Sequence, residues 1–251
     1  MAFLKTLRNF FVSVWFFIGF FLYVWVYGSF RLVQAKFIER KHGKDAAVIF
    51  LKDVLSSFGK NVFKLLFCKV NVIGKENIPN GKGGLVIVSN HQSLLDIPLI
   101  VGYVHTAGFV SKKELLKAPV IGSFIKAVGC IPIDRKNPAQ AAVALRNLTK
   151  SLLNGNKICI FPEGTRTDDG HVADFRTGSL SIPMKYKIPI LPVTIDGDYK
   201  LMKKNSFLLN PSTIKVFIDQ PVDASAFSDE QALIDHIRAK MINNIAKGEH
   251  L

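Results

Sequence analysis

A histidine and an aspartate five residues apart could form a catalytic pair in this chain. His91 follows residues 85–89, a short β-branched run without charges that predicts a buried strand. On a regular helix His91 and Asp96 would point about 140° apart, since each residue turns the helix by about 100°. If His91 lies in a turn and Asp96 at the start of the next helix, the carboxylate can hold one ring nitrogen and leave the other to act as a base. The pair includes no protein nucleophile, so the attacking group would be a hydroxyl of the substrate.

Asp96 also has a purely structural interpretation. Ser93 and Asp96 have the spacing of a capping box, in which Asp96 would only cap a helix. Pro98 argues against a helix that begins at Ser93, because proline would then fall at the fifth helical position and remove a backbone donor. With Asp96 as the N-cap, Pro98 falls in the first turn, where proline is tolerated. The spacing alone leaves both interpretations open.

Three more groups of charged residues follow predicted strands. They are residues 111–114 with Lys113, residues 129–135 with Arg135, and residues 161–166 with Arg166. A guanidinium group at the carboxyl end of a strand is well suited to bind a phosphate through two hydrogen bonds. Gly164 would let its loop approach a ligand closely, and Glu163 could hold Arg166 or bind a hydroxyl. For each group the alternative is an ordinary surface turn, in which Asp134 would pair with Arg135.

Length and composition suit one sizeable α/β domain with an appendage. The 251 residues carry a formal net charge of +14, which implies an anionic partner, either nucleic acid or a phospholipid surface. An apolar content of 49% favours the membrane. The three cysteines are scattered and the six histidines lack zinc-ligand spacing, so we expect no disulfide framework, no metal site and a reducing compartment. Neither a nucleophile elbow nor a P-loop is present.

The N-terminal part predicts a membrane-docking segment of two helices. Residues 9–30 contain no charge and as a helix would span about 33 Å, enough for a bilayer core. A signal peptide or a buried core helix explains this run less well. Residues 45–67 predict a second helix with an apolar stripe and a row of lysines, which either lies among lipid headgroups or simply packs on the domain. Basic residues are more frequent after the first helix than before it, which predicts a cytoplasmic domain downstream.

The rest of the chain predicts a largely parallel mixed sheet flanked by helices, because short apolar runs alternate with helical stretches. The expected domains are residues 1–69, the docking helices, and residues 70–251, the α/β domain. Strands are expected at 85–89, 108–111, 130–133, 157–161, 190–195 and 213–219. Helices are expected at 97–103, 113–127, 138–153, 177–186 and 228–246.

Four blocks of the chain together resemble the motifs of the lysophosphatidic acid acyltransferases, the 1-acylglycerol-3-phosphate O-acyltransferases of the wider glycerolipid acyltransferase superfamily. In family order they are Asn90-His91-x4-Asp96, residues 129–135, residues 161–166 and Leu191-Pro192-Val193. Lys113-Glu114-Leu115 also resembles a lysine-containing segment of the family. Leu191 is a departure, since that block usually begins with valine. The N-terminal helices are similar to the unspecific docking helices of bacterial members, and the last 50 residues add nothing to the resemblance.

The resemblance implies an acyl transfer that the residues can support. A fatty acyl group would pass from acyl-CoA or acyl carrier protein to the 2-hydroxyl of lysophosphatidic acid, giving phosphatidic acid without a cofactor. His91 would be the general base and Asp96 would orient it. Phosphate binding would fall to Arg166, with Lys113 and Arg135 as further candidates. Glu163, Gly164 and Thr165 would shape the phosphate loop.

The implied partners are a lysophospholipid acceptor, an acyl thioester donor and an anionic membrane surface, with no nucleic acid. The implied location is the membrane, in a bacterium the inner membrane, with the catalytic domain in the cytoplasm. Two alternatives remain from the sequence. The same motifs could serve glycerol 3-phosphate or another lysophospholipid, or the chain could bind lipid without catalysis, in which case replacing His91 would be harmless.

Overall fold

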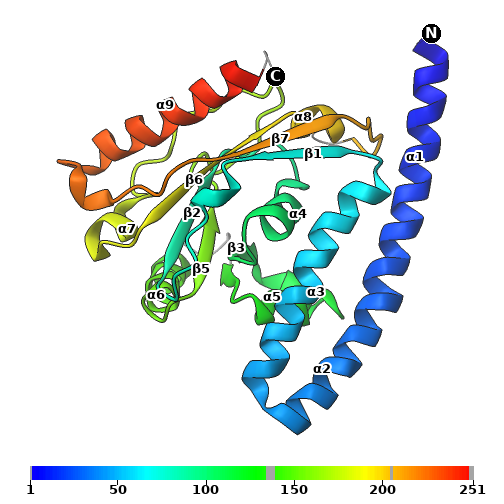
Figure 1. Cartoon of the computed structure of the whole chain (residues 1–251), viewed down its shortest axis with the longest axis horizontal. Coiled ribbons are helices and arrows are strands. Elements are labelled where there is room, and N and C mark those ends of the chain that lie inside the picture. Colours follow the sequence, from blue (N-terminus) through cyan, green and yellow to red (C-terminus); the bar gives the residue numbers. More distant parts are fainter. Residues whose placement is uncertain (1, 134–138, 204–205, 249–251) are drawn as a thin grey trace.

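The computed structural model describes residues 2–133, 139–203 and 206–248, which build one seven-stranded sheet with helices on both faces (Figure 1). In spatial order the strands are β1 (Lys69–Ile73), β7 (Thr213–Ile218), β6 (Ile190–Asp196), β2 (Leu85–Ser89), β5 (Lys157–Ile160), β3 (Gly108–Lys112) and β4 (Ile131–Ile133). Every neighbouring pair is parallel except β6 and β7, which are antiparallel. The prediction of a largely parallel mixed sheet is therefore confirmed, with all six expected strands present.

The edge strand β1 was not predicted. It is short, begins with a lysine and alternates valine with asparagine, so it lacks the continuous apolar run that marks the central strands. Its pairing with β7 is parallel and joins residues far apart in the chain, Lys69 with Thr213 and Ile73 with Phe217.

The helices flank the sheet and mostly match the expected ranges. They are α1 (Ala2–Leu22), α2 (Gly28–His42), α3 (Lys44–Leu65), α4 (Asp96–Leu99), α5 (Ile121–Ala127), α6 (Ala139–Leu153), α7 (Ser181–Tyr186), α8 (Asp198–Leu201) and α9 (Glu230–Gly248). The expectation of one helix at 113–127 was wrong. A 3₁₀ turn, Lys113–Lys117, ends before Pro119, which forces Ala118 into the extended region (φ −66°, ψ 123°), and α5 begins beyond it. Residues 177–180, expected as helix, form a turn before α7.

The sheet separates two apolar cores, as a strand buried on both faces requires. Leu85 and Ile87 of β2 pack on the side of α3 and α4, whereas Val86 and Val88 face the helices α6, α7 and α9. All four side chains are buried. The alternation is the period-two pattern of a strand, repeated here with apolar residues on both faces because helices cover both.

The N-terminal helices form a hairpin against one edge of the molecule. A π turn, Tyr23–Tyr27, joins α1 to α2 without breaking the helix, and Gly43, with φ +86°, ends it. Helix α3 then returns along α2, and its Val62 and Phe63 lie in the core below the sheet. The predicted second helix thus packs on the domain.

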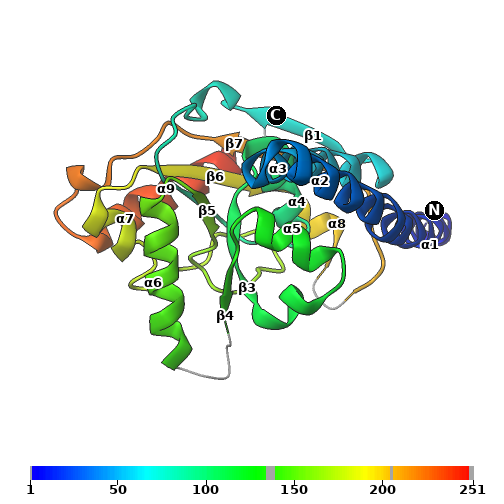
Figure 2. The same cartoon turned by 90° about the horizontal axis from the view of Figure 1, so that it is seen from below.

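Most of the long first helix is uncovered, and it projects beyond the sheet in both views (Figures 1 and 2). Within the part of the chain that the structure describes, Phe3–His42 is the one helix long and apolar enough to cross a membrane. Its exposed side chains are mainly aromatic and aliphatic: Phe3, Leu4, Phe10, Phe11, Trp15, Ile18, Phe21, Leu22, Val26, Phe30 and Phe37.

Candidate active site

The predicted site residues that the structure describes follow neighbouring strands and lie at one edge of the sheet. Strands β2, β5, β3 and β4 are neighbours and run parallel, so their carboxyl ends lie on the same side. His91 follows β2, residues 161–166 follow β5, and Lys113 follows β3 directly. Arg135, predicted after β4, lies outside the described residues. This edge is the usual ligand-binding side of a parallel α/β sheet.

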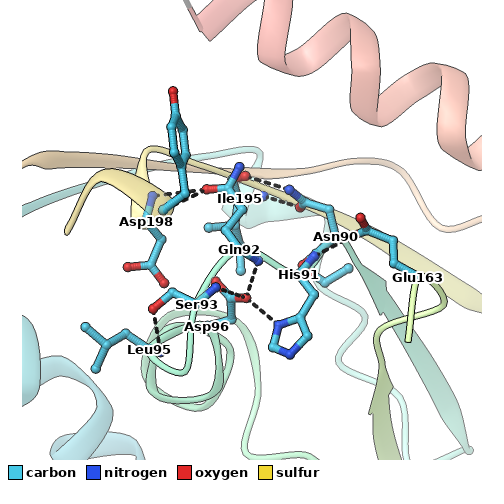
Figure 3. Close-up of polar contacts among 11 residues, drawn as sticks. Asn90, His91, Gln92, Ser93, Leu95, Asp96, Glu163, Ile195 and Asp198 are labelled. Carbon is cyan, nitrogen blue, oxygen red and sulfur yellow. Dashed lines mark hydrogen bonds and ion pairs between the residues drawn. The ribbon is translucent and has the colours of Figure 1, made fainter. Parts of the chain in front are cut away.

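His91 and Asp96 are in direct contact. The Nδ1 atom of His91 lies 2.7 Å from Oδ2 of Asp96, which is the first residue of α4 and is completely buried (Figure 3). The carboxylate can only accept a hydrogen bond, so Nδ1 carries the proton and the lone pair of the neutral ring is on Nε2. This is the tautomer that a general base needs, and the His91 side chain stays partly accessible, at 18%.

The structural interpretation of Asp96 holds at the same time. Its Oδ2 also accepts the backbone N–H groups of Gln92 (2.7 Å) and Ser93 (2.9 Å), and Ser93 Oγ accepts the N–H of Leu95 (3.0 Å). These hydrogen bonds hold residues 92–96 in a compact turn, in which the ring of His91 points toward the carboxylate of Asp96. Oδ2 of Asp96 therefore both closes the turn and orients His91. Pro98 lies in the first turn of α4, as expected if the helix begins near Asp96.

Burial sets the electrostatics of this pair. It raises the pKa of the Asp96 carboxyl from its ordinary value to about 7, although hydrogen bonds from Asp198 and from the backbone of Ser93 and Gln92 act in the opposite direction. A carboxyl group with a pKa of about 7 is only partly ionised at neutral pH. The hydrogen bonds from neighbouring residues therefore decide how much of it is ionised.

The loop after β5 fastens His91 from the other side. Glu163 accepts the backbone N–H of His91 (2.6 Å) with one oxygen and that of Ala173 (2.9 Å) with the other, while Thr167 N donates to His91 O (3.0 Å). The ring of Phe161 stacks on the imidazole with a centroid distance of 4.1 Å. Glu163 is buried, which raises the pKa of its carboxyl. Both of its oxygens accept backbone N–H groups, whereas the sequence suggested that Glu163 holds Arg166, binds a hydroxyl or shapes the loop.

Asn90 and Gln92 were not predicted as site residues. The amide of Asn90 pairs with both Ile195 N and Ile195 O at 2.8 Å and thereby extends the contact between β2 and β6. Gln92 accepts the N–H groups of Asp198 (3.1 Å) and Tyr199 (3.4 Å). No local pattern marks these partners, because they lie more than a hundred residues away along the chain.

The predicted phosphate loop is compact. Gly164 has a left-handed φ of +71°, and a Cβ there would collide with the guanidinium of Arg176. Thr165 is exposed and Arg166 half-exposed on the same loop. Arg176 is a basic residue at this loop that the sequence analysis missed, since it follows no predicted strand.

An apolar cavity of about 280 Å³ lies beside His91 and Asp96. Ile97 and Pro98, directly after Asp96, belong to its wall, and so does Phe109, whose ring lies next to Phe161. The N-terminal hairpin supplies a large part of the wall: Phe20, Tyr23, Val24, Tyr27, Val54, Leu55 and Phe58. Almost all of the exposed lining is carbon, so the cavity suits a hydrocarbon chain.

Across residues 2–133, 139–203 and 206–248, no group of three or more histidine, cysteine, aspartate or glutamate side chains is arranged to hold a metal ion.

Comparison with known proteins gives consistent results. Residues 69–196 match the family model described as Acyltransferase. The chain is 30% identical over 181 residues to a 1-acyl-sn-glycerol-3-phosphate acyltransferase of Borreliella burgdorferi, covering 70% of this chain and 72% of the relative. It is 33% identical over 160 residues to the chloroplastic enzyme LPAT1 of Arabidopsis thaliana, covering 63% of this chain and 45% of the relative. The chain thus spans about half the length of such plant relatives.

One solved structure is similar over nearly the whole chain. The crystal structure of the 1-acyl-sn-glycerophosphate acyltransferase PlsC from Thermotoga maritima matches with a TM-score of 0.89 and 33% identity, and the match covers 98% of both chains.

Proposed function

Because the chain belongs to the 1-acylglycerol-3-phosphate acyltransferase family, we propose that it transfers a fatty acyl group from a thioester to the 2-hydroxyl of lysophosphatidic acid. The product is phosphatidic acid. The observation that carries the proposal is the 2.7 Å contact between His91 and Asp96 at the sheet edge, next to an apolar cavity.

His91 acts as the base in this mechanism. Its Nε2 takes the proton of the 2-hydroxyl while the hydroxyl oxygen attacks the thioester carbonyl carbon. The tetrahedral intermediate then breaks its C–S bond, and the imidazolium gives the proton to the leaving sulfur. Asp96 keeps the ring oriented and stabilises its positive charge between the two steps. Proton transfer of this kind contributes about 10²–10⁴-fold to the rate.

The basic residues at the same edge bind the phosphate of the acceptor. Arg166 is the main candidate, with Lys113 and Arg135 as further contacts, and Glu163, Gly164 and Thr165 keep the loop in shape. A guanidinium group is suited to this task because its planar donors match two phosphate oxygens.

The apolar cavity takes the acyl chain of the donor. Its wall continues directly from Asp96 to Ile97 and Pro98, so a chain inside it would end near the histidine. Each buried methylene contributes about 0.8 kcal/mol of transfer free energy, which makes a cavity of this kind selective for chain length. The donor carrier is either coenzyme A or acyl carrier protein.

The exposed apolar helix docks the enzyme on a membrane. Acceptor and product are lipids whose chains stay in the bilayer, so docking lets the active site reach a headgroup without extracting the lipid. The aromatic side chains along α1 and the basic residues that follow it suit an anionic lipid surface with the domain in the cytoplasm.

The test uses the purified full chain in liposomes with labelled lysophosphatidic acid and oleoyl or palmitoyl thioester on each carrier. Wild type is compared with His91→Ala and with the control His236→Ala, which changes an exposed histidine on α9. We expect phosphatidic acid from wild type and control, and a loss of kcat for His91→Ala of about 10²-fold or more. An equal kcat for all three proteins would refute the general-base role, and acylation of other acceptors alone would refute the assigned substrate.

A further inference from the structure

A second buried carboxyl group lies against the catalytic aspartate. Asp198 is the first residue of α8, just beyond β6, and like Asp96 it is completely buried. Its backbone N–H donates to Gln92 Oε1 at 3.1 Å, which fixes Asp198 beside the loop that carries His91. Figure 3 shows its carboxyl group pointing toward Ser93 and Asp96.

The hydrogen bonds of the two carboxyl groups are unequal. Oδ2 of Asp96 receives three donors, namely His91 and the backbone of Gln92 and Ser93. Oδ1 of Asp96 and both oxygens of Asp198 are buried and have no donor in good hydrogen-bond geometry among the described residues when both groups are ionised, although the hydroxyl of Ser93 lies near Asp198. A buried acceptor without a donor is costly, and a buried charge without one costs more.

A single proton bound to one of the two carboxyl groups supplies the hydrogen-bond donor that their buried oxygens lack. Two carboxylates side by side in a buried site cannot both stay ionised, because each charge opposes the other. Asp96 has three close donors that stabilise a negative charge, whereas among the described residues Asp198 has at most the hydroxyl of Ser93, so the proton belongs on Asp198. The O–H group of Asp198 then donates to Oδ1 of Asp96, and the two side chains are within reach of such a hydrogen bond.

The other titratable groups around the two carboxyl groups do not supply this proton. They are His91 and Glu163 from the loops after β2 and β5, Cys159 on β5, and Cys68 before β1. Burial raises the pKa of both thiols, which are therefore neutral at neutral pH. Burial also raises the pKa of Asp198 well above its ordinary value, and the charge of Asp96 raises it further.

We propose that Asp198 is a neutral carboxylic acid that donates a hydrogen bond to Asp96 and so keeps Asp96 ionised and aligned on His91. Asp198 is a positioning residue: it acts through Asp96 and touches no substrate. Its effect on turnover rests on the proposed acyl transfer, but its protonation state does not.

Two replacements of Asp198 separate the donor role from simple packing. Asp198→Asn keeps a donor of the same shape, whereas Asp198→Leu keeps the branching at Cγ in a larger side chain and removes the donor. Both are neutral, as the protonated acid is. We expect Asp198→Asn to retain kcat within about twofold and Asp198→Leu to lose about 10-fold to 100-fold in kcat, with KM unchanged, because one oxygen of Asp96 loses its donor.

The direction in which each variant shifts the acid limb of the pH–activity profile shows whether Asp198 is neutral or ionised. Asp96 must be ionised, so activity is lost as pH falls through its pKa. If Asp198 is neutral, the leucine variant raises the pKa of Asp96 and moves the acid limb to higher pH, while the asparagine variant leaves it in place. If Asp198 were ionised, both variants would remove a like charge and move the limb to lower pH, which would overturn the proposal, as would equal kcat values for the two variants.

Infrared spectroscopy tests the proton without any assay. Wild type at about pH 8, where Asp96 with its pKa of about 7 is mostly ionised, should show one buried carboxylic-acid carbonyl band that is missing in Asp198→Asn. The absence of such a band in wild type would overturn the proposal. The measurement stays decisive even if the leucine variant does not fold, or if wild type does not acylate lysophosphatidic acid and the proposed function fails.

Discussion

The carboxylate of Glu163 holds the backbone N–H of His91 at 2.6 Å, although the two residues are 72 positions apart in the chain. The same carboxylate holds Ala173 with its second oxygen. Through this contact the loop after β5 fixes the position from which the imidazole reaches Asp96. The alignment of the catalytic pair therefore depends on a residue outside the sequence motif that contains it.

Replacing Glu163 by Gln should disturb catalysis and stability together. The amide nitrogen cannot accept a hydrogen bond, so one backbone N–H loses its partner and unfolding becomes easier by about 1–3 kcal/mol. We expect a lower kcat as well, because His91 is no longer held. Glu230→Gln is the matched control, since Glu230 accepts two backbone N–H groups, of Gly178 and Leu180, away from the site. If kcat fell equally in both variants, the effect would be one of general stability.

Arg166→Ala should chiefly raise the KM for the lysolipid. Loss of a hydrogen bond to a charged group costs about 1.5–3 kcal/mol, so we expect KM to rise about 10-fold to 100-fold while kcat changes little. His91→Ala should have the opposite pattern. Steady-state kinetics with varied acceptor concentration measure both constants. The control is Arg146→Ala, an exposed arginine on α6, and an unchanged KM for Arg166→Ala would remove that residue from the phosphate site.

Activity and stability should change in opposite directions with pH. The pKa of Asp96 is raised to about 7 by burial, so its ionised form, which catalysis needs, is lost as pH falls through about 7. A carboxyl group with a raised folded-state pKa stabilises the fold most at low pH, and this stability is lost as pH rises through the same value. We expect the Tm of wild type to fall between about pH 4 and pH 7 more steeply than that of Asp96→Asn, which has no carboxyl group at this position. Parallel Tm curves for the two proteins would contradict the assignment.

Filling the apolar cavity should shorten the preferred acyl chain. Val54 is buried in the cavity wall on α3, and phenylalanine at this position occupies space that a chain would use. Each methylene that no longer fits costs about 0.8 kcal/mol, or about fourfold in kcat/KM. Comparison of thioesters of increasing length measures the shift. Val143→Phe on the exposed face of α6 is the control, and an unchanged preference for Val54→Phe would place the acyl chain elsewhere.

Removing aromatic side chains from α1 should weaken membrane binding. Phe10, Trp15 and Phe21 are each more than half exposed, and replacing all three by serine removes about 1.5–3 kcal/mol of transfer free energy per side chain. We expect less protein to sediment with phospholipid vesicles while activity on a water-soluble acceptor is kept. A second variant neutralises Lys52, Lys60 and Lys64 on α3. If only this second variant lost binding, charge rather than apolar contact would hold the enzyme on lipid.

The central strands and the contact between His91 and Asp96 could be predicted because their signals are local. Residues 85–89 form an uninterrupted apolar run, and His91 and Asp96 lie within one turn of it. The break before α5 was not predicted, although Pro119, the residue that follows the extended Ala118, is visible in the sequence. The domain boundary near residue 69 stays a prediction.

The partners of the pair could not be predicted, because their contacts join distant segments. Glu163 could be assigned to a loop but not to the backbone of His91, and nothing near Asp198 marks a residue that meets Asp96. Such contacts follow from the strand order, which places β6 and β5 on either side of β2. Strand order is set by the packing of the whole sheet and has no short sequence signature.

The shared wall of the apolar cavity has a practical consequence for protein engineering. Phe20, Tyr23 and Phe58 of the N-terminal hairpin belong to the same wall as Ile97 and Phe109, so the hairpin and the rest of the fold build this cavity together. Removing the first two helices to make the protein easier to handle in water would open this cavity, which is the proposed site of the acyl chain. Detergents or lipid nanodiscs are therefore the appropriate solvents for this enzyme, and redesign of its chain-length preference can start from the anchor as well as from the domain.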